Sequence, residues 1–213
     1  MAQFRDTTGR PGPSTWAAGH YPEGMADFPV SGVSWFEASA YAAFAGKSLP
    51  VVAQWYRAAP PDLADYTIPA SNTSSKALAP VGTYKGLGPY GTYDMASNVS
   101  EWVANPVDPD LRVLLGGSWK SPSYLYSEPE ALSPFNRSET NGFRCVRNLG
   151  PLPRAAEGPV RHAARDFSNF KPVSDDVFRA YEALYLYPKM PLNAAVEGIV
   201  KETADWREEK VYV

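Results

Sequence analysis

Residues that interrupt regular secondary structure are unusually frequent in this chain, and so are aromatic residues. The 213 residues include 21 Pro and 16 Gly beside 13 Tyr, 9 Phe and 6 Trp. Pro and Gly together make about 12% of an average protein, and this chain exceeds that share. Aromatic rings bury a large area per residue, so a chain rich in them is expected to fold. The combination predicts a loop-rich globule around an aromatic core.

Length, charge and cysteine content exclude several classes of protein. The chain is long enough for one ordinary domain with an appendage. A formal charge of −3 gives no basic excess for binding nucleic acid. A single cysteine, Cys145, leaves no intrachain disulfide and no two-cysteine metal motif. No apolar run approaches the roughly 20 residues that span a bilayer, and residues 1–10 are unlike a secretory signal. We therefore expect a cytoplasmic protein without membrane or nucleic-acid partners.

Composition changes near residue 148. Five of the six Trp and 13 of the 16 Gly precede residue 149. Three prolines then fall within residues 149–159, which is typical of a linker or an extended strap. The sequence predicts a first domain at residues 1–148 and an appendage at residues 149–213.

The secondary structure expected for the first domain is sparse. Ser34 can cap a helix over residues 34–45, and Glu37, three residues later, completes a capping box. A shorter helix is expected at residues 51–59, because Pro60 follows it. Short strands are expected at residues 79–84, 91–95, 113–117 and 142–146. In the appendage, residues 174–186 predict an amphipathic helix and residues 210–213 a strand.

Five motifs follow one another along the chain. They are VSWFEASAYAAFAGKSLP (33–50), APVGTY (79–84), GTYDMASNVSEW (91–102), LLGGSW (114–119) and NGFRCVR (141–147). Together they resemble the formylglycine-generating enzyme, or sulfatase-modifying factor, family over about residues 4–147. The resemblance implies an α+β, loop-rich fold similar to C-type lectins, with few short strands and two main helices.

Two departures from the family concern completeness. The family's usual opening strand and helix have no counterpart, so we expect an N-terminally incomplete domain. The tail resembles the junction into a following domain of larger bacterial proteins. An incomplete sheet exposes unpaired backbone, so we predict that residues 160–213 cover the gap, within one chain or by exchange in a homodimer.

The NVSEW segment offers oxygen ligands for a hard cation. Asn98, Glu101 and neighbouring carbonyls such as that of Val99 are ligands of the kind that Ca²⁺ prefers. The resemblance implies the same, since the family binds calcium through this segment. The alternative is that Asn98 forms a turn and Glu101 pairs with an arginine. We expect a structural calcium ion here.

The residues that carry the family's own reaction are absent. Active members use two cysteines and a copper ion, and the matching positions here hold Ser121 and Tyr126. Neither side chain is the soft thiolate that Cu(I) requires. Cys145 is interpreted as a core residue. The resemblance to sulfoxide synthases implies iron-binding histidines on a helical domain that this sequence lacks. We therefore expect no copper and a member that has lost its cysteine pair.

Two functions stay open. The first is a non-catalytic module that binds a small molecule or a protein, because aromatic loops on a rigid scaffold suit binding. Its ligand contacts would be Trp119, Tyr124, Tyr126 and Arg137, unless the rings pack on the core instead. The second is a metal- or serine-dependent hydrolase of esters or phosphoesters. Its catalytic candidates are Ser121, His20 and Asp94.

Overall fold

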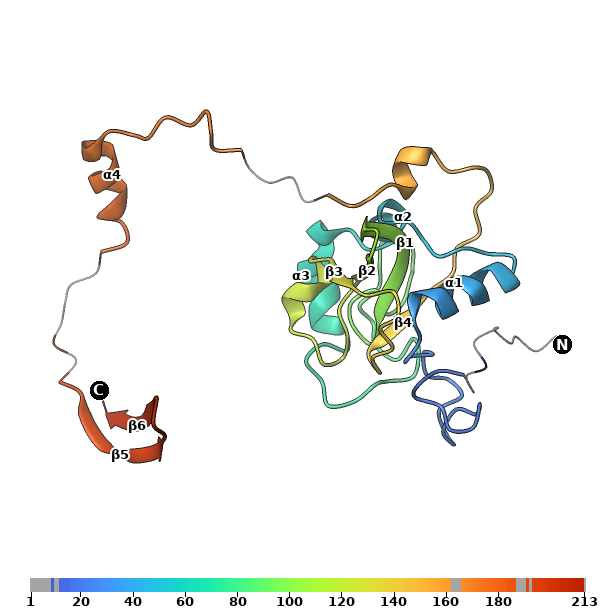
Figure 1. Cartoon of the computed structure of the whole chain (residues 1–213), viewed down its shortest axis with the longest axis horizontal. Helices are drawn as coiled ribbons and strands as arrows, with labels where there is room; N and C mark the ends of the chain where they lie inside the picture. Colours follow the sequence, from blue (N-terminus) through green and yellow to red (C-terminus); the bar gives the residue numbers. More distant parts are fainter. Residues whose placement is uncertain (1–8, 10–11, 162–165, 187–190, 192, 213) are drawn as a thin grey trace. The chain divides into compact units, whose positions relative to one another are not determined.

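The computed structural model describes residues 9, 12–161, 166–186, 191 and 193–212, and the chain divides into two units, Met1–His162 and Ala163–Val213 (Figure 1). The helices of the first unit are α1 (Trp35–Phe44), α2 (Val52–Ala58) and α3 (Ala64–Thr67), with 3-10 turns at Pro61–Leu63, Ile68–Ala70, Ser123–Tyr126 and Arg154–Glu157. Its strands are β1 (Ser100–Asp108), β2 (Leu111–Leu115), β3 (Glu130–Leu132) and β4 (Asn141–Phe143). The second unit holds α4 (Asp175–Glu182), β5 (Ala195–Glu202) and β6 (Arg207–Tyr212).

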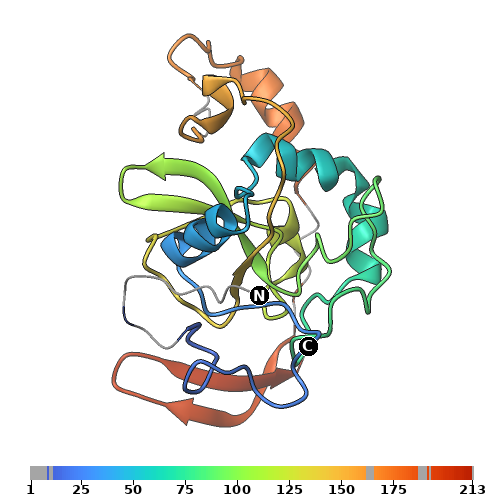
Figure 2. The ribbon, with the colours of Figure 1, turned by 90° about the vertical axis from the view of Figure 1, so that its right-hand side faces the viewer.

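One four-stranded sheet organises the first unit, in the order β3-β2-β1-β4 (Figure 2). β1 pairs antiparallel with β2 and parallel with β4, so that Glu101 lies beside Gly142. The expected strands at 113–117 and 142–146 correspond to β2 and β4. Those expected at 79–84 and 91–95 are wrong, because these residues form turns and bends. The central strand β1 was not expected, since Pro106 interrupts its pattern; the register shifts on both sides of Pro106 accommodate the proline.

The capping box predicted at the start of α1 is confirmed. The Ser34 hydroxyl accepts from the backbone N–H of Glu37 at 3.2 Å, and the Glu37 carboxylate accepts from the backbone N–H of Ser34 at 2.8 Å. The same carboxylate forms an ion pair with Arg137 at 2.8 Å. The cap therefore also ties α1 to the segment that leads into β4.

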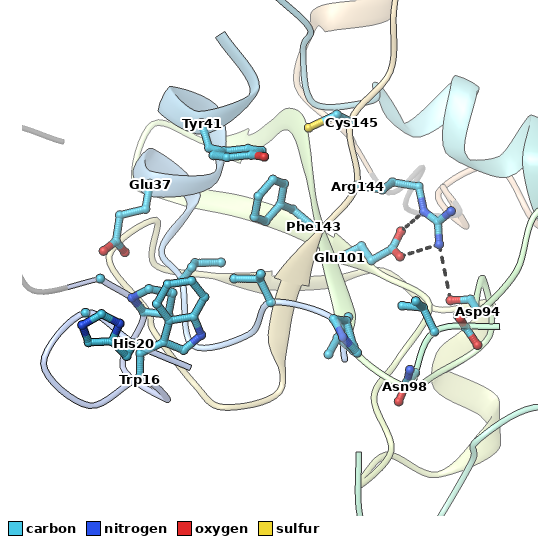
Figure 3. Close-up of a pocket in the computed structure, with 18 of the residues that line it drawn as sticks. Trp16, His20, Glu37, Tyr41, Asp94, Asn98, Glu101, Phe143, Arg144 and Cys145 are labelled. Carbon is cyan, nitrogen blue, oxygen red and sulfur yellow. Dashed lines mark hydrogen bonds and ion pairs between the residues drawn. The ribbon is translucent and has the colours of Figure 1, made fainter. Parts of the chain in front are cut away.

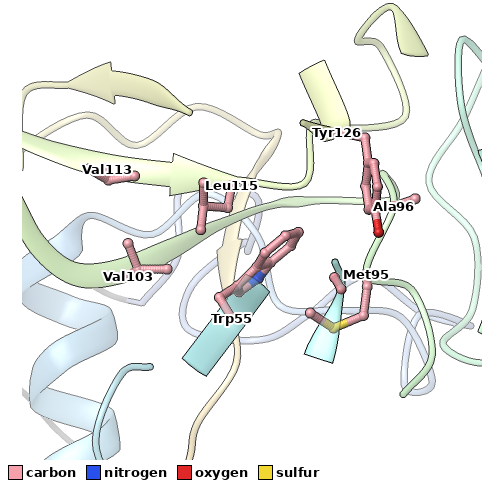
Figure 4. Packing of buried hydrophobic residues seen from close by; sticks show 8 residues of the cluster. Trp55, Met95, Ala96, Val103, Val113, Leu115 and Tyr126 are labelled. Atoms are coloured by element: carbon pink, nitrogen blue, oxygen red, sulfur yellow. The ribbon is translucent and has the colours of Figure 1, made fainter. Parts of the chain in front are cut away.

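Alternating residues of β1 and β2 feed two cores on opposite faces of the sheet, as the period of a strand requires. On one face, Trp102 and Leu114 pack with Ala38 of α1. The other face holds the cluster of Trp55, Ala59, Met95, Ala96, Val103, Val113, Leu115 and Tyr126 (Figure 4). Trp55 and Trp102 are 1% and 0% exposed, so aromatic rings fill the space that the short elements leave.

The proline-rich strap after residue 148 runs along the first unit. The Asn105 amide donates to the carbonyls of Ala156 and Gly158, both at 2.8 Å. The backbone N–H of Val160 donates to the carbonyl of Pro106 at 2.8 Å. These bonds attach the strap to β1, and the division between the units falls after His162.

The second unit consists of a short helix and an antiparallel hairpin, β5–β6. α4 is shorter than the predicted helix over 174–186, and β6 begins earlier than the predicted strand at 210. Among its described residues, every side chain except that of Glu209 is exposed. Within the described part of the chain, no helix combines the length and the apolar character needed to cross a bilayer.

Candidate functional site

The segment after β2 turns sharply through two glycines. Gly116 and Gly117 have φ angles of +89° and +67°, a region that side chains rarely adopt. A Cβ at Gly116 would lie 2.8 Å from the Met95 carbonyl oxygen. After the turn, the Ser121 hydroxyl accepts from the backbone N–H of Ser118 at 3.0 Å and lies 2.9 Å from the Ser118 hydroxyl. The Ser121 side chain therefore closes a local turn.

The structure does not bring the three catalytic candidates together. His20 and Asp94 both line the larger of two clefts, and Ser121 lines neither. Lys120, which precedes Ser121 in the sequence, forms an ion pair with Glu139. Among the described residues, the hydrogen-bond partners of the Ser121 hydroxyl come from Ser118 alone, so no base activates it.

Tyr126 lies in the core and is not a surface contact for a ligand. Its ring is 2% exposed and lies 6.3 Å from that of Trp55, centroid to centroid. Burial raises the pKa of the Tyr126 phenol, against a hydrogen bond with Thr67 that lowers it. Tyr126 thus packs inside the core, as the alternative to ligand contact expected.

Of the other three predicted ligand residues, Trp119 lines one of the two described clefts, and Tyr124 and Arg137 line neither. Tyr124 is exposed, and Arg137 forms an ion pair with Glu37. Trp119 lines a smaller cleft of about 350 Å³. Its other walls are Trp16, Tyr21, Met25, Phe28 and Leu78, with Thr15, Pro22, Ala26, Pro29, Val30, Ser31 and Glu139 completing it. Lys120 lies 4.7 Å from the centroid of the Trp119 ring. The cleft is aromatic with an ion pair beside it.

The Glu101 carboxylate is held by three donors, two of them from Arg144 as Figure 3 shows. Arg144 donates to both of its oxygens, from Nε at 2.5 Å and Nη2 at 2.6 Å. The Trp55 indole N–H donates to Oε2 at 2.7 Å. Burial alone would lower the pKa of Arg144, but the Glu101 carboxylate and Asp94 raise it above its usual value. Arg144 thus stays charged and neutralises Glu101 inside the protein.

The Asn98 side chain is likewise occupied by hydrogen bonds within the protein, and the φ of this residue is +65°. Its side-chain oxygen accepts from the Asn72 amide and the Ala79 N–H, and its amide donates to the Ala79 carbonyl, all at 3.0 Å. Asp94 braces the neighbouring turn by accepting from Gly82 N–H at 2.7 Å.

These partners decide how well the predicted calcium ligands fit an ion. The predicted ligands are the side chains of Asn98 and Glu101 and the carbonyl of Val99. Both side chains already accept hydrogen bonds from the protein, and an ion at Glu101 would have to displace Arg144. Within the described residues, no three His, Cys, Asp or Glu side chains gather in a metal-binding group. The predicted set therefore does not fit Ca²⁺ in this arrangement, and the arginine alternative describes Glu101.

The larger cleft, of about 1200 Å³, was not anticipated from the sequence. α1 lines it with Tyr41, and the segment from Phe143 to Cys145 faces the same space (Figure 3). Cys145, expected in the core, is half-buried and lines this cleft; burial raises the pKa of its thiol, although Lys47 opposes the shift. No spacing in the sequence indicates that these segments meet.

The motifs, the sheet and the glycine turn can now be set beside known proteins. The profile of a family described as the sulfatase-modifying factor enzyme 1-like domain matches residues 5–149. The chain belongs to this family. The predicted fold class is thereby confirmed: a mixed α+β domain with few helices and short strands.

Three relatives illustrate the range of the sulfatase-modifying factor family. The chain is 33% identical over 154 residues to the serine/threonine-protein kinase pkn1 of Chlamydia pneumoniae, and the matched segment covers 59% of this chain and 25% of that protein. It is 32% identical over 158 residues to inactive Cα-formylglycine-generating enzyme 2 of Bos taurus, covering 60% and 52%. It is 32% identical over 184 residues to hercynine oxygenase of Mycobacterium tuberculosis, covering 67% and 42%. The chain spans between a quarter and about half of the length of these relatives.

Proposed function

We propose that this sulfatase-modifying factor domain is a non-catalytic binding module. The observation that carries the proposal is the state of the two positions that match the family's cysteine pair. The Ser121 hydroxyl closes a turn with Ser118, and the Tyr126 ring is part of the core. Neither supplies a soft ligand for copper, and no base lies against Ser121 among the described residues. The bovine relative, whose name calls it inactive, also supports a non-catalytic role.

The ligand-binding surface of this module is proposed at the Trp119 cleft. Its volume of about 350 Å³ is within the lower range of ligand pockets, which are mostly apolar with few polar groups. Met25 adds an adaptable side chain to the rigid rings of Trp16 and Trp119. Such a cleft suits an apolar side chain of a protein, with Tyr124 exposed nearby in sequence to add contact area.

Peptide selection tests the binding surface. A random 12-residue peptide phage library is panned against the whole chain, and the recovered peptides are measured by isothermal titration calorimetry. Trp119→Ala should weaken them at least about tenfold, because it removes one wall of the cleft. The matched control, exposed Phe135→Ala, should leave the affinity unchanged. Recovered peptides that ignore Trp119→Ala would refute this surface.

Copper binding and turnover test the absence of catalysis. Cu(I) titration against a chromophoric chelator should find no stoichiometric site, and a cysteine-containing sulfatase peptide should stay unmodified. An ester and phosphoester panel should show no activity that Ser121→Ala removes. Stoichiometric Cu(I), a formylglycine product or a Ser121-dependent hydrolysis would each overturn the proposal.

A further inference from the structure

The larger cleft has walls suited to the apolar part of a ligand, and it is a different space from the Trp119 cleft. Its volume of about 1200 Å³ exceeds the usual 300–1,000 Å³ of small-molecule pockets, so a drug-sized ligand fits in part of it. Its apolar lining includes Trp16, Val33, Tyr41, Tyr93, Val99 and Phe143. The centroids of the Tyr41 and Phe143 rings lie 5.6 Å apart, so the two rings together form an aromatic part of the wall.

Most of the charged side chains that line this cleft form ion pairs. Glu37 is 9% exposed and pairs with Arg137, and Glu101 is 4% exposed and pairs with Arg144. Asp94 is the acid that these pairs leave over among the described lining residues. Its carboxylate accepts one backbone N–H, that of Gly82. With Arg137, which pairs with Glu37 and is not itself a lining residue, these described groups leave one excess negative charge beside apolar walls. Charges act more strongly there than in water.

The cations near Asp94 do not remove this excess. The Arg144 guanidinium donates to the Asp94 backbone carbonyl at 3.5 Å, while both of its short bonds go to Glu101. The Asp94 carboxylate also attracts Arg144, but one guanidinium does not balance two carboxylates. Lys85 donates to the Gly82 carbonyl and lies 5.3 Å from the centre of the Tyr93 ring, and it is not among the lining residues. His20 lines the cleft and is itself exposed.

We infer that the larger cleft binds a small organic cation with an apolar body, such as an aryl-alkyl amine. Its ammonium group would lie at the Asp94 carboxylate, beside the Tyr93 ring. Its apolar body would lie along Phe143 and Tyr41, where it leaves water. A neutral ligand of the same shape would keep the apolar contacts and lose the charge.

A matched series of ligands tests the charge preference without any mutation. The probes are 4-phenylbutylamine, 4-phenylbutanol and 4-phenylbutyrate, which share a body and differ in charge. Calorimetric titration at pH 7 and low salt should rank the amine about tenfold tighter than the alcohol, and the acid weakest. Equal affinities, or tightest binding of the acid, would overturn the inference.

Asp94→Asn locates the charge. Asn tolerates the φ of +56° at this position and keeps an oxygen for the Gly82 N–H, so the turn should persist. The variant should bind the amine no better than the alcohol. Asp110→Asn, in the exposed turn between β1 and β2, removes the same net charge elsewhere and should leave the series unchanged. Loss of the preference in both variants, or in neither, would overturn the assignment to Asp94.

Cys145 supplies an independent readout, because it is the chain's single cysteine and lines the cleft. Methanethiosulfonate reagents transfer a thioethyl-trimethylammonium or a thioethyl-sulfonate group to the thiolate, so that a mixed disulfide forms and methanesulfinate leaves. The cationic reagent should react faster relative to the anionic one in the wild type than in Asp94→Asn. This ratio corrects for the nearby Lys47, which is common to both proteins. A ratio unchanged by Asp94→Asn would contradict the inference.

The amine should also protect Cys145 from alkylation, which separates this site from the proposed function. Trp119→Ala should weaken peptides at the smaller cleft and leave amine protection intact. Protection lost in Trp119→Ala, or absent at saturating amine, would count against a separate site in the larger cleft.

Discussion

Residues 12–161 and residues 166–212 reach their structures by different means. The first region has two buried clusters, one around Trp55 and one around Trp102. In the second region, the amphipathic α4 and the β5–β6 hairpin leave apolar side chains such as Phe178 and Trp206 exposed. A two-stranded hairpin is marginal by itself in water. We therefore expect the first region to be stable by itself and the second to need a further surface, which the predictions below test.

The largest expected effect comes from removing one aromatic ring from each region and comparing the loss of stability. Trp55→Ala should cost about 3–5 kcal/mol of unfolding free energy, because it leaves a cavity and removes the donor to Glu101. Phe178→Ala, on exposed α4, should change that free energy by less than about 0.5 kcal/mol. Urea unfolding followed by tryptophan fluorescence and circular dichroism measures both. A comparable loss for Phe178→Ala would show that α4 shares the core's stability.

A second prediction compares a buried and an exposed ion pair within the first region. Glu101→Gln should cost about 3 kcal/mol, because it leaves the Arg144 charge without its buried partner. Glu139→Gln, which breaks the exposed pair with Lys120, should cost less than about 1 kcal/mol. Thermal and urea unfolding of the two variants give the difference. Equal costs would mean that the Glu101 network contributes no more than a surface pair.

Local signals in the sequence predicted the helices and missed the central strand. The Ser34–Glu37 box depends on residues three apart, so it is visible without the fold, and α1 begins where it indicates. β1 is a strand only because β2 and β4 pair with it on both sides. Its proline hides the pattern, and the same residues look like a metal-binding loop.

The candidate site was predictable only where one segment determines it. The glycine turn before Trp119 follows from the GGSW motif, and the loss of both cysteines can be read at Ser121 and Tyr126. The partner of Glu101 lies 43 positions away in Arg144. The larger cleft requires distant segments, around residues 16, 41, 94 and 143, to lie side by side, and neither periodicity nor spacing in the sequence indicates this.

A third prediction asks what supports the second region. We propose that two copies associate through residues 163–213, as the exposed β5–β6 hairpin favours. Light scattering after size exclusion should give a dimer for the full chain and a monomer for residues 1–162. The unfolding free energy of the first unit should change by about 1 kcal/mol or less on truncation, since its cores are internal. A full-length chain that stays monomeric, or a dimer that persists after residues 163–213 are removed, would contradict the proposal.

The smallest expected effect concerns calcium, and it tests whether the first region is self-sufficient. Arg144 already supplies the cation that the Glu101 carboxylate needs, and Asn98 is bonded to Asn72 and Ala79. An ion stabilises a fold only to the extent that it binds the folded state better than the unfolded one. Chelation should therefore move the midpoint of thermal unfolding by less than about 1 °C, a shift of a few tenths of a kcal/mol. Elemental analysis of the purified protein is the control, and stoichiometric calcium with a large drop in the midpoint would show that the ion displaces Arg144.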